Sequence, residues 1–442
     1  MKNKTKLVWF SGSLSNILKD VKFVVNGGKR LEGEVEVRGF KNAATPILAA
    51  TLLTERPCVI KNLPLIGDVL NFIGIIESIG SKVEWLDART VRITNDNIDP
   101  SKLNKDLVCK MRSSILLLGP ILSRFGSIEM KTPGGCHIGV RPMDVHFDAF
   151  KTLGFDVKYD EADDVYSLNR TGDVKSSEVV LSEFSVTATE NILMFGALNP
   201  GLTIKIAALE PHIEDLSKFL WALGAKISGI GTHTLYVEKG LETGGEVEHV
   251  IMNDPIEAGT FMALGFTTKS DIVISGAPVE TLTLPLLKFK EMGCSFSVEG
   301  NKIVVEGSKS NLVATKKIEV RPYPGFPSDL QAPFGVLATQ AEGETMIFDT
   351  LYEGRLKYLY ELEKMGATIE ILDPHRGIIK GPTKLVGTEV ESIDLRAGAT
   401  LIIAALAAEG RTVLNNAEQI DRGYEKIEER LAKIGAEIER IK

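Results

Sequence analysis

The chain has 442 residues, of which 44% are apolar and 25% charged, and its formal net charge is −8. This length exceeds one compact core, so we expect two or three domains. The acidic balance argues against nucleic acid or an anionic membrane as the main partner, and no apolar run is long enough to cross a membrane. Four widely spaced cysteines without zinc-type His or Cys spacing predict no metal site, and they fit a reducing, cytoplasmic compartment.

The first twenty residues stand apart from the rest of the chain. They contain lysines and one apolar run, Leu7–Phe10, which is too short for the core of a signal peptide. We therefore expect residues 1–20 to be an N-terminal extension of the folded protein.

One pattern repeats six times along the chain: an amphipathic helix, a glycine, and an alternating strand. The glycines recur every 69 to 74 residues, and they are Gly80, Gly154, Gly224, Gly293, Gly366 and Gly435. Glycine in this place is typical of a helix C-cap, where the chain turns into a strand. Self-similarity at a nearly fixed period indicates repeated structural units.

A second helix precedes each of these amphipathic helices and is apolar on nearly every face. The six segments are 43–53, 113–124, 188–198, 257–268, 330–340 and 397–408. Helices of this kind are expected to be buried. With a hairpin after each glycine and a strand before each buried helix, every unit is predicted to be β–α–β–α–β–β. The predicted fold class is therefore α/β (α+β), built from six copies of this unit.

The strand count predicts how the units are divided. The sixth unit stops at Lys442 after one strand, and an unassigned strand, 22–26, precedes the first unit. The economical solution is that the N-terminal strand completes the sixth unit. Three units then form a domain over 41–252, and the other three form a second domain from 21–40 and 253–442. Two crossings, near Gly39–Phe40 and near Asn253–Asp254, are typical of a two-strand hinge.

Many cations are expected at one end of this arrangement. If strands and helices alternate in direction, the N-termini of all buried helices meet there, where α/β folds bind ligands and where anions are favoured. A surface salt bridge is the alternative for any one of these residues. Together they predict a cleft for an anionic ligand, because guanidinium groups match phosphate and carboxylate. The residues are Lys41, Arg112, Arg141, Arg355, Arg396 and Arg422, with Asp329 and Asp394 among them.

A loop rich in glycine and proline, 132–142, lies between a predicted strand and a predicted helix. It holds Cys136 among backbone N–H groups, His137 and Arg141, an environment that favours the reactive thiolate. An ordinary turn with an exposed cysteine is the alternative. We expect a lid that closes over the cleft when ligand draws the two domains together.

Six motifs make the chain resemble the enolpyruvyl transferase family from about Phe23 to Lys442. They are Gly39–Ala43, Met111–Ser113, Gly134–His146, Pro324–Gln331, Ile393–Ala397 and Ile420–Tyr424. The resemblance implies two similar domains of inside-out α/β barrel type, with the active site in the cleft between them.

The resemblance also implies an activity and its substrates. The branch with the cysteine loop transfers the enolpyruvyl group of phosphoenolpyruvate to the 3-hydroxyl of UDP-N-acetylglucosamine in peptidoglycan synthesis, by addition and elimination. Both substrates are small molecules, and neither a cofactor nor a metal is implied. The other branch, which makes 5-enolpyruvylshikimate 3-phosphate, lacks that loop.

Residue roles follow from the same resemblance. Lys41, Arg141 and Arg422 would hold the phosphate, with Arg355 and Arg396 near the carboxylate. Asp329 matches the candidate base for the sugar hydroxyl, or a plain helix cap, and Cys136 matches the proposed proton donor and fosfomycin target. The implied nucleotide-sugar site comprises Asn42, Arg112, Arg141, Pro142, Met143, Asp144, Val145, Glu183, Phe184, Ser185, Val186, Asp329 and Leu351, and Asp394 is added as a neighbour of Arg396.

Several residues depart from the family pattern without removing a named catalytic group. They include Phe40, Thr187, His212 and Pro255. They leave the fit of the acceptor open, so a different uridine nucleotide is one alternative acceptor. A non-catalytic paralogue that binds UDP-N-acetylglucosamine is the second alternative, and the retention of Asp329 and Cys136 speaks against it.

Overall fold

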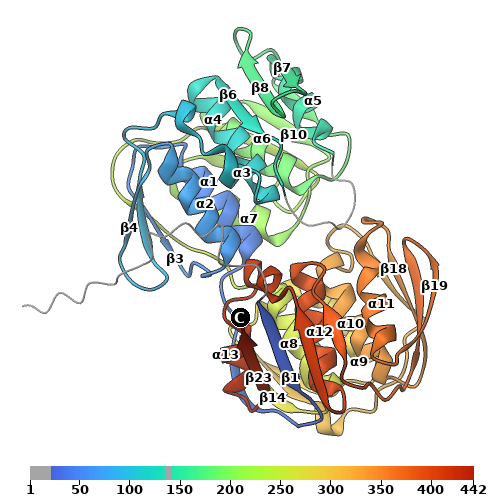
Figure 1. The fold of residues 1–442 in the computed structure, drawn as a ribbon. Coiled ribbons are helices and arrows are strands. Elements are labelled where there is room, and N and C mark those ends of the chain that lie inside the picture. Colours follow the sequence, from blue (N-terminus) through green and yellow to red (C-terminus); the bar gives the residue numbers. More distant parts are fainter. Residues whose placement is uncertain (1–20, 135–141) are drawn as a thin grey trace, which may run out of the picture.

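The structure is a computed structural model that describes residues 21–134 and 142–442. The extension 1–20 and the segment 135–141, which includes Cys136 and Arg141, lie outside the described residues. Figure 1 shows two lobes, one containing the helices from α1 to α7 and the other those from α8 to α13. The C-terminus lies in the second lobe, beside strand β1 from the start of the described chain.

Six small sheets are formed by the described residues, and none mixes strands from 41–252 with strands from the rest. The first lobe contains β13 (Val247–Val250), β3 (Cys58–Lys61), β5 (Val91–Thr94) and β4 (Lys82–Trp85) in one sheet, β11 (Lys226–Ser228), β12 (Thr234–Lys239), β10 (Leu202–Lys205) and β9 (Glu178–Val180) in another, and β6 (Ser127–Lys131), β8 (Val165–Arg170) and β7 (Phe155–Asp160) in a third. The second lobe contains β21 (Glu389–Glu391), β22 (Arg411–Asn415), β1 (Lys22–Asn26) and β23 (Glu437–Ile441), then β15 (Phe296–Glu299), β16 (Lys302–Glu306), β14 (Asp271–Ser275) and β2 (Glu32–Glu36), and finally β17 (Lys317–Val320), β18 (Gly343–Asp349), β20 (Arg376–Gly381) and β19 (Thr368–Asp373).

The N-terminal strand completes the last sheet, as the strand count predicts. Strand β1 lies antiparallel between β22 and β23, with Phe23 opposite both Leu414 and Arg440. It takes the place that the second hairpin strand holds in the other sheets, for example β12 beside β10. Residues more than 380 positions apart in sequence therefore share one sheet.

All six repeat glycines adopt the left-handed backbone conformation, with φ between 75° and 110°. Each follows an amphipathic helix and precedes a strand, which confirms the predicted C-caps. The helices are α2 (Gly67–Ser78), α5 (Asp144–Thr152), α7 (Pro211–Ala222), α9 (Thr283–Glu291), α11 (Tyr358–Lys364) and α13 (Ile427–Ala432).

One unit departs from the predicted pattern, because its leading strand is replaced by short helices. The 3₁₀ helix Pro100–Lys102 and α3 (Lys105–Val108) stand where the strand was expected, and that sheet has three strands. The side chains of Asp99 and Asn104 accept hydrogen bonds from the backbone N–H groups that open these turns. Pro100 cannot donate to a strand ladder, so this sequence favours capped turns.

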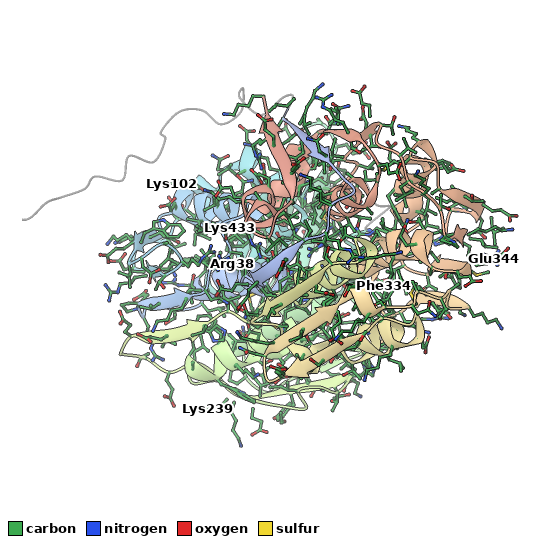
Figure 2. All side chains as sticks on the ribbon, turned by 90° about the horizontal axis from the view of Figure 1, so that it is seen from below. Arg38, Lys102, Lys239, Phe334, Glu344 and Lys433 are labelled. Atoms are coloured by element: carbon green, nitrogen blue, oxygen red, sulfur yellow. The ribbon has the colours of Figure 1, made fainter. Side chains whose placement is uncertain are left out.

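The predicted apolar helices form the core of each lobe. All thirteen residues of α8 are buried, and Phe334 on α10 is fully buried. In Figure 2 the labelled side chain of Phe334 lies among the helices, whereas those of Lys239 and Glu344 extend outward. The six are α1 (Lys41–Thr51), a 3₁₀ turn (Arg112–Leu117) continuing into α4 (Leu118–Phe125), α6 (Val186–Leu198), α8 (Pro255–Thr267), α10 (Ser328–Gln340) and α12 (Leu395–Ala407).

The two crossing segments are hydrogen-bonded to each other. Gly39 and Asn253 form an isolated antiparallel bridge, and the N–H of Phe40 donates to the carbonyl of Met252 at 2.8 Å. These are the positions at which the sequence predicts the crossings.

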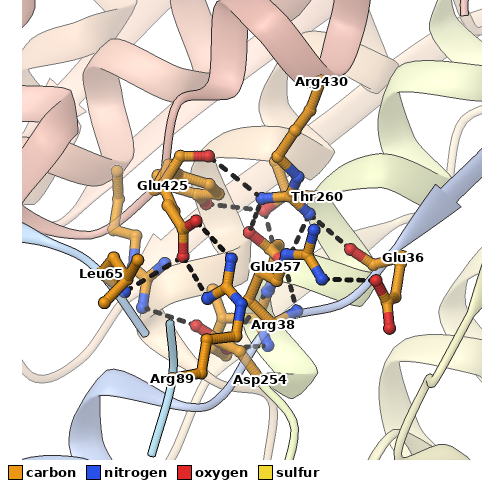
Figure 3. A network of polar contacts seen from close by, with 12 residues as sticks. Glu36, Arg38, Leu65, Arg89, Asp254, Glu257, Thr260, Glu425 and Arg430 are labelled. Carbon is orange, nitrogen blue, oxygen red and sulfur yellow. Dashed lines mark hydrogen bonds and ion pairs between the residues drawn. The ribbon is translucent and has the colours of Figure 1, made fainter. Parts of the chain in front are cut away.

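A buried ion pair supports this junction (Figure 3). Arg430 donates to both carboxylate oxygens of Glu257, at 2.6 and 3.0 Å, and also to the carbonyl of Glu36. The same carboxylate accepts from the N–H of Arg38 at 2.8 Å. The Arg430 and Glu257 side chains are 8% and 3% exposed, so each charge depends on its partner.

We predict that Glu257→Ala lowers the free energy of unfolding by about 3–5 kcal/mol, because it leaves the Arg430 charge buried and unpaired. Urea unfolding of the variant measures this loss. The matched control is Glu214→Ala, which removes one partner of an exposed pair with Lys218 and should cost less than about 1 kcal/mol. Similar losses in both variants would contradict the structural importance of the buried pair.

Candidate active site

A cleft of about 810 Å³ lies between the lobes and is lined by residues of both. Asp68 and Asp329 are the two carboxylates at the centres of its main ion-pair clusters. The predicted site residues that line the cleft are Lys41, Asn42, Arg112, Pro142, Glu183, Phe184, Ser185, Val186, Asp329, Leu351, Arg355, Arg396 and Arg422.

Other predicted site residues lie elsewhere. Met143 and Val145 are buried against the core, and Asp144 is exposed at the first position of α5. Asp394 caps α12, because its carboxylate accepts hydrogen bonds from the N–H groups of Arg396 and Ala397 at 2.7 and 3.0 Å. None of these four is among the residues that line the cleft. Cys136 and Arg141 are outside the described residues.

Helix N-termini position the functional side chains. Lys41 is the first residue of α1, Asp329 is the second of α10 and Arg396 is the second of α12. On α6 the Ser185 hydroxyl accepts from the N–H of Ala188 at 3.4 Å, so the N-cap itself borders the cleft. The positive ends of these helices add to the charge of the side chains and favour an anionic ligand.

Asp68 joins a lysine of one lobe to an arginine of the other. Its carboxylate lies 2.9 Å from Lys41 Nζ and 3.0 Å from Arg422 Nε. Burial raises the pKa of Asp68, but Lys41 and Arg422 outweigh it and lower the pKa below its usual value. The expectation that facing cations repel each other and hold the cleft open is therefore wrong for this pair, because an ionised carboxylate lies between them.

Asp329 forms the centre of a second ion-pair cluster. It accepts a hydrogen bond from Arg355 and another from Arg396 Nε at 3.1 Å. Burial raises its pKa, but Arg396, Arg355 and Lys41 together lower the pKa of Asp329 to about 2. The alternative that Asp329 is a plain helix cap is wrong, because Pro327 is the N-cap residue and the Asp329 oxygens face the two arginines.

Sequence reasoning missed several residues that line the cleft. Asp68 was noted only as part of a loop, although an acidic residue in the first turn of an apolar helix is a usable signal. Glu190, Glu210 and Tyr323 carried no recognisable spacing, and only the fold brings them to the cleft. His146 accompanies them, and its Nε2 lies 3.0 Å from the Thr187 hydroxyl.

The described residues contain no cluster of three or more His, Cys, Asp or Glu side chains that could hold a metal ion. In the same part of the chain, no helix is both long and apolar enough to cross a membrane. The cleft instead offers guanidinium and ammonium groups beside carboxylates, which suits a small ligand with more than one anionic group.

The sequence matches the EPSP synthase (3-phosphoshikimate 1-carboxyvinyltransferase) family over residues 25–431. It is 41% identical over 428 residues to UDP-N-acetylglucosamine 1-carboxyvinyltransferase of Bradyrhizobium diazoefficiens, covering 95% of this chain and 98% of that one. It is also 41% identical over 423 residues to the protein of the same name from Halothermothrix orenii, covering 95% and 100%.

Solved structures agree with this family. The enolpyruvyl transferase NikO from Streptomyces tendae superposes with a TM-score of 0.86 at 26% identity, over 96% of this chain and 99% of its own. EPSP synthase from Acinetobacter baumannii shares the fold, with a TM-score of 0.73 at 19% identity, over 96% and 100%. The match to the family and these likenesses cover nearly the whole described chain, and this chain belongs to the enolpyruvyl transferase family.

Proposed function

We propose that the chain transfers the enolpyruvyl group of phosphoenolpyruvate to the 3-hydroxyl of UDP-N-acetylglucosamine and releases inorganic phosphate. This reaction commits the sugar to peptidoglycan. The observation that carries the proposal is a single cleft with two ion-pair clusters, Lys41–Asp68–Arg422 and Arg355–Asp329–Arg396. Relatives at 41% identity that bear the name of this activity support it.

Each cluster suits one anionic group of phosphoenolpyruvate. Lys41 and Arg422, together with Arg141, would bind the phosphate, and Arg355 and Arg396 would bind the carboxylate. The ligand competes with Asp68 and Asp329 for the same cations.

The nucleotide sugar would occupy the remaining length of the cleft. Its reacting hydroxyl would face Asp329. The residues proposed to contact it are Asn42, Arg112, Arg141, Pro142, Met143, Asp144, Val145, Glu183, Phe184, Ser185, Val186 and Leu351, with Asp394 acting through the helix that carries Arg396.

The proposed chemistry is addition followed by elimination. The sugar hydroxyl adds to C2 of phosphoenolpyruvate while C3 gains a proton, and loss of phosphate then restores the double bond. Asp329 takes the hydroxyl proton. Its low pKa belongs to the ligand-free pairing, and a bound carboxylate that draws Arg355 and Arg396 away raises its basicity. Protonation of C3 is assigned to Cys136 from the sequence motif alone.

The proposed enzyme consists of two units, residues 41–252 and residues 21–40 with 253–442, and works in the cytoplasm on small molecules. The strand pairing supports this division, since each sheet is made within one unit. The proposal includes no cofactor, no metal and no nucleic-acid partner.

We predict that the protein releases phosphate from phosphoenolpyruvate only when UDP-N-acetylglucosamine is present, without added metal. A coupled assay for inorganic phosphate measures this directly. Release with UMP instead would assign the chain to another uridine-nucleotide acceptor, release with shikimate 3-phosphate would assign it to the other branch of the family, and no release at all would favour a binding paralogue.

Asp329→Asn should lower kcat by roughly 10²–10⁴-fold, because the amide keeps the shape of the side chain but cannot accept the hydroxyl proton. Steady-state kinetics and the thermal midpoint are measured together. Near-normal turnover in the variant would show that Asp329 only balances the two arginines.

Asp68→Asn should strengthen the binding of inorganic phosphate by roughly tenfold, because Lys41 and Arg422 lose the carboxylate that neutralises them. Isothermal titration at low salt measures the dissociation constant. If affinity is unchanged or falls, the phosphate does not bind at this pair.

A further inference from the structure

One stretch of the cleft wall carries three acid–base side chains that the mechanism above does not use. Glu190 lies on α6, Glu210 is the N-cap residue of α7, and His212 lies in the first turn of α7. All three line the cleft, yet Glu190 is 1% exposed and His212 is 5% exposed.

Each of the three has a polar atom without a hydrogen-bond partner among the described residues: Glu190 Oε1, Glu210 Oε2 and His212 Nδ1. The distance from Glu190 Oε1 to His212 Nε2 is 3.9 Å, too long for a hydrogen bond. Buried polar atoms in native proteins are almost always paired, with protein, water or ligand. Three unpaired atoms on one stretch of a ligand cleft therefore indicate a place where a bound molecule supplies the partners.

This stretch is electrically neutral, in contrast to the cationic clusters. Burial raises the pKa of Glu190 well above its usual value, and the nearby Glu210 carboxyl raises it further. Burial lowers the pKa of His212 to about 4. Near pH 7 a protonated Glu190 can donate one hydrogen bond and accept others, and a neutral imidazole offers one donor and one acceptor. Such groups suit uncharged hydroxyl and amide groups better than phosphate.

The stretch adjoins the reacting centre. The Asp329 carboxylate lies near enough to His212 to favour its protonation, although burial dominates. On its other side the His212 ring contacts the edge of Phe40, with 5.3 Å between ring centroids, and Phe40 directly precedes Lys41. A group that bonds to His212 is therefore close to the hydroxyl that faces Asp329.

We propose that Glu190 and His212 form a neutral polar subsite that hydrogen-bonds the ring substituents of the acceptor sugar and so selects an uncharged, hydroxyl- and amide-bearing ring. The subsite deepens the proposed function and rests on it. The cations fix the anionic groups of both substrates, and this subsite orients the sugar ring beside Asp329. Both residues act by positioning the substrate.

The test compares two replacements of Glu190 with two ligands, using the full chain and isothermal titration. Glu190→Leu keeps the volume but removes hydrogen bonding, and it should weaken the binding of UDP-N-acetylglucosamine by roughly tenfold. The affinity for UDP, which lacks the sugar, should change by less than about twofold. Glu190→Gln, which can still donate and accept, should recover most of the affinity for the nucleotide sugar.

Stability provides a second readout that a merely structural role would not give. Replacing an unpaired buried carboxyl by leucine should leave the thermal midpoint unchanged or raise it, whereas loss of a structural hydrogen bond would lower it. The matched control is Thr412→Val, which removes an unpaired buried hydroxyl on β22, away from the cleft, and should not alter the affinity for either ligand.

His212→Leu provides an independent test, and we expect it to weaken UDP-N-acetylglucosamine binding in the same selective way. The inference is overturned if either folded leucine variant binds UDP-N-acetylglucosamine like the wild type, or if UDP affinity falls by the same factor. A wild-type protein that binds UDP-N-acetylglucosamine while the variants show no selective loss contradicts the subsite alone. A wild-type protein that does not bind it contradicts the proposed function and the subsite together.

Discussion

The site depends on the electrostatic balance between crowded cations and two buried carboxylates. Lys41 and Arg396 stand in the first turns of buried helices, where the helix ends are already positive. Without counter-charges, such a group of cations in a partly buried cleft would destabilise the fold. Asp68 and Asp329 supply those charges, and each lies between two cations. A ligand that brings its own anionic groups can replace them, so the ligand-free cleft is stable and still receptive.

The repeat explains why these residues meet. Each unit places the N-terminus of a buried helix at the same end of its lobe, and the two lobes present those ends to a common cleft. The crossing segments near Gly39 and Asn253 are hydrogen-bonded to each other, and the buried Glu257–Arg430 pair fixes their surroundings. Position in the repeat thus becomes position in the site.

The architecture was largely predictable from the sequence, because its signals are local and repeated. Glycines such as Gly154 and Gly366 mark left-handed C-caps, and fully apolar helices such as α8 mark the core. The strand missing from one sheet was not predicted, since capping by Asp99 and Asn104 outweighs the repeat pattern locally.

The site was less predictable, because its geometry depends on contacts between distant segments. The convergence of cations followed from topology, but the bridge from Asp68 to Arg422 joins residues 354 positions apart, and no local pattern announces it. The roles of Glu190 and His212 depend on burial and on missing partners, which sequence does not reveal. Asp394 shows the opposite error: proximity to Arg396 in sequence suggested a substrate contact, and its carboxylate in fact caps the helix.

The placement of β1 between β22 and β23 has a consequence for biosynthesis. During translation every strand of the first lobe emerges before residue 252, whereas the last sheet needs residues 22–26 from the beginning of the chain and residues 437–441 from its end. An edge of β1 must therefore stay unpaired until synthesis is nearly finished, and unpaired strand edges are prone to aggregation. Pairing over such a sequence separation also makes closure of this sheet slow. The second lobe is consequently the part of the nascent protein that most needs protection by chaperones.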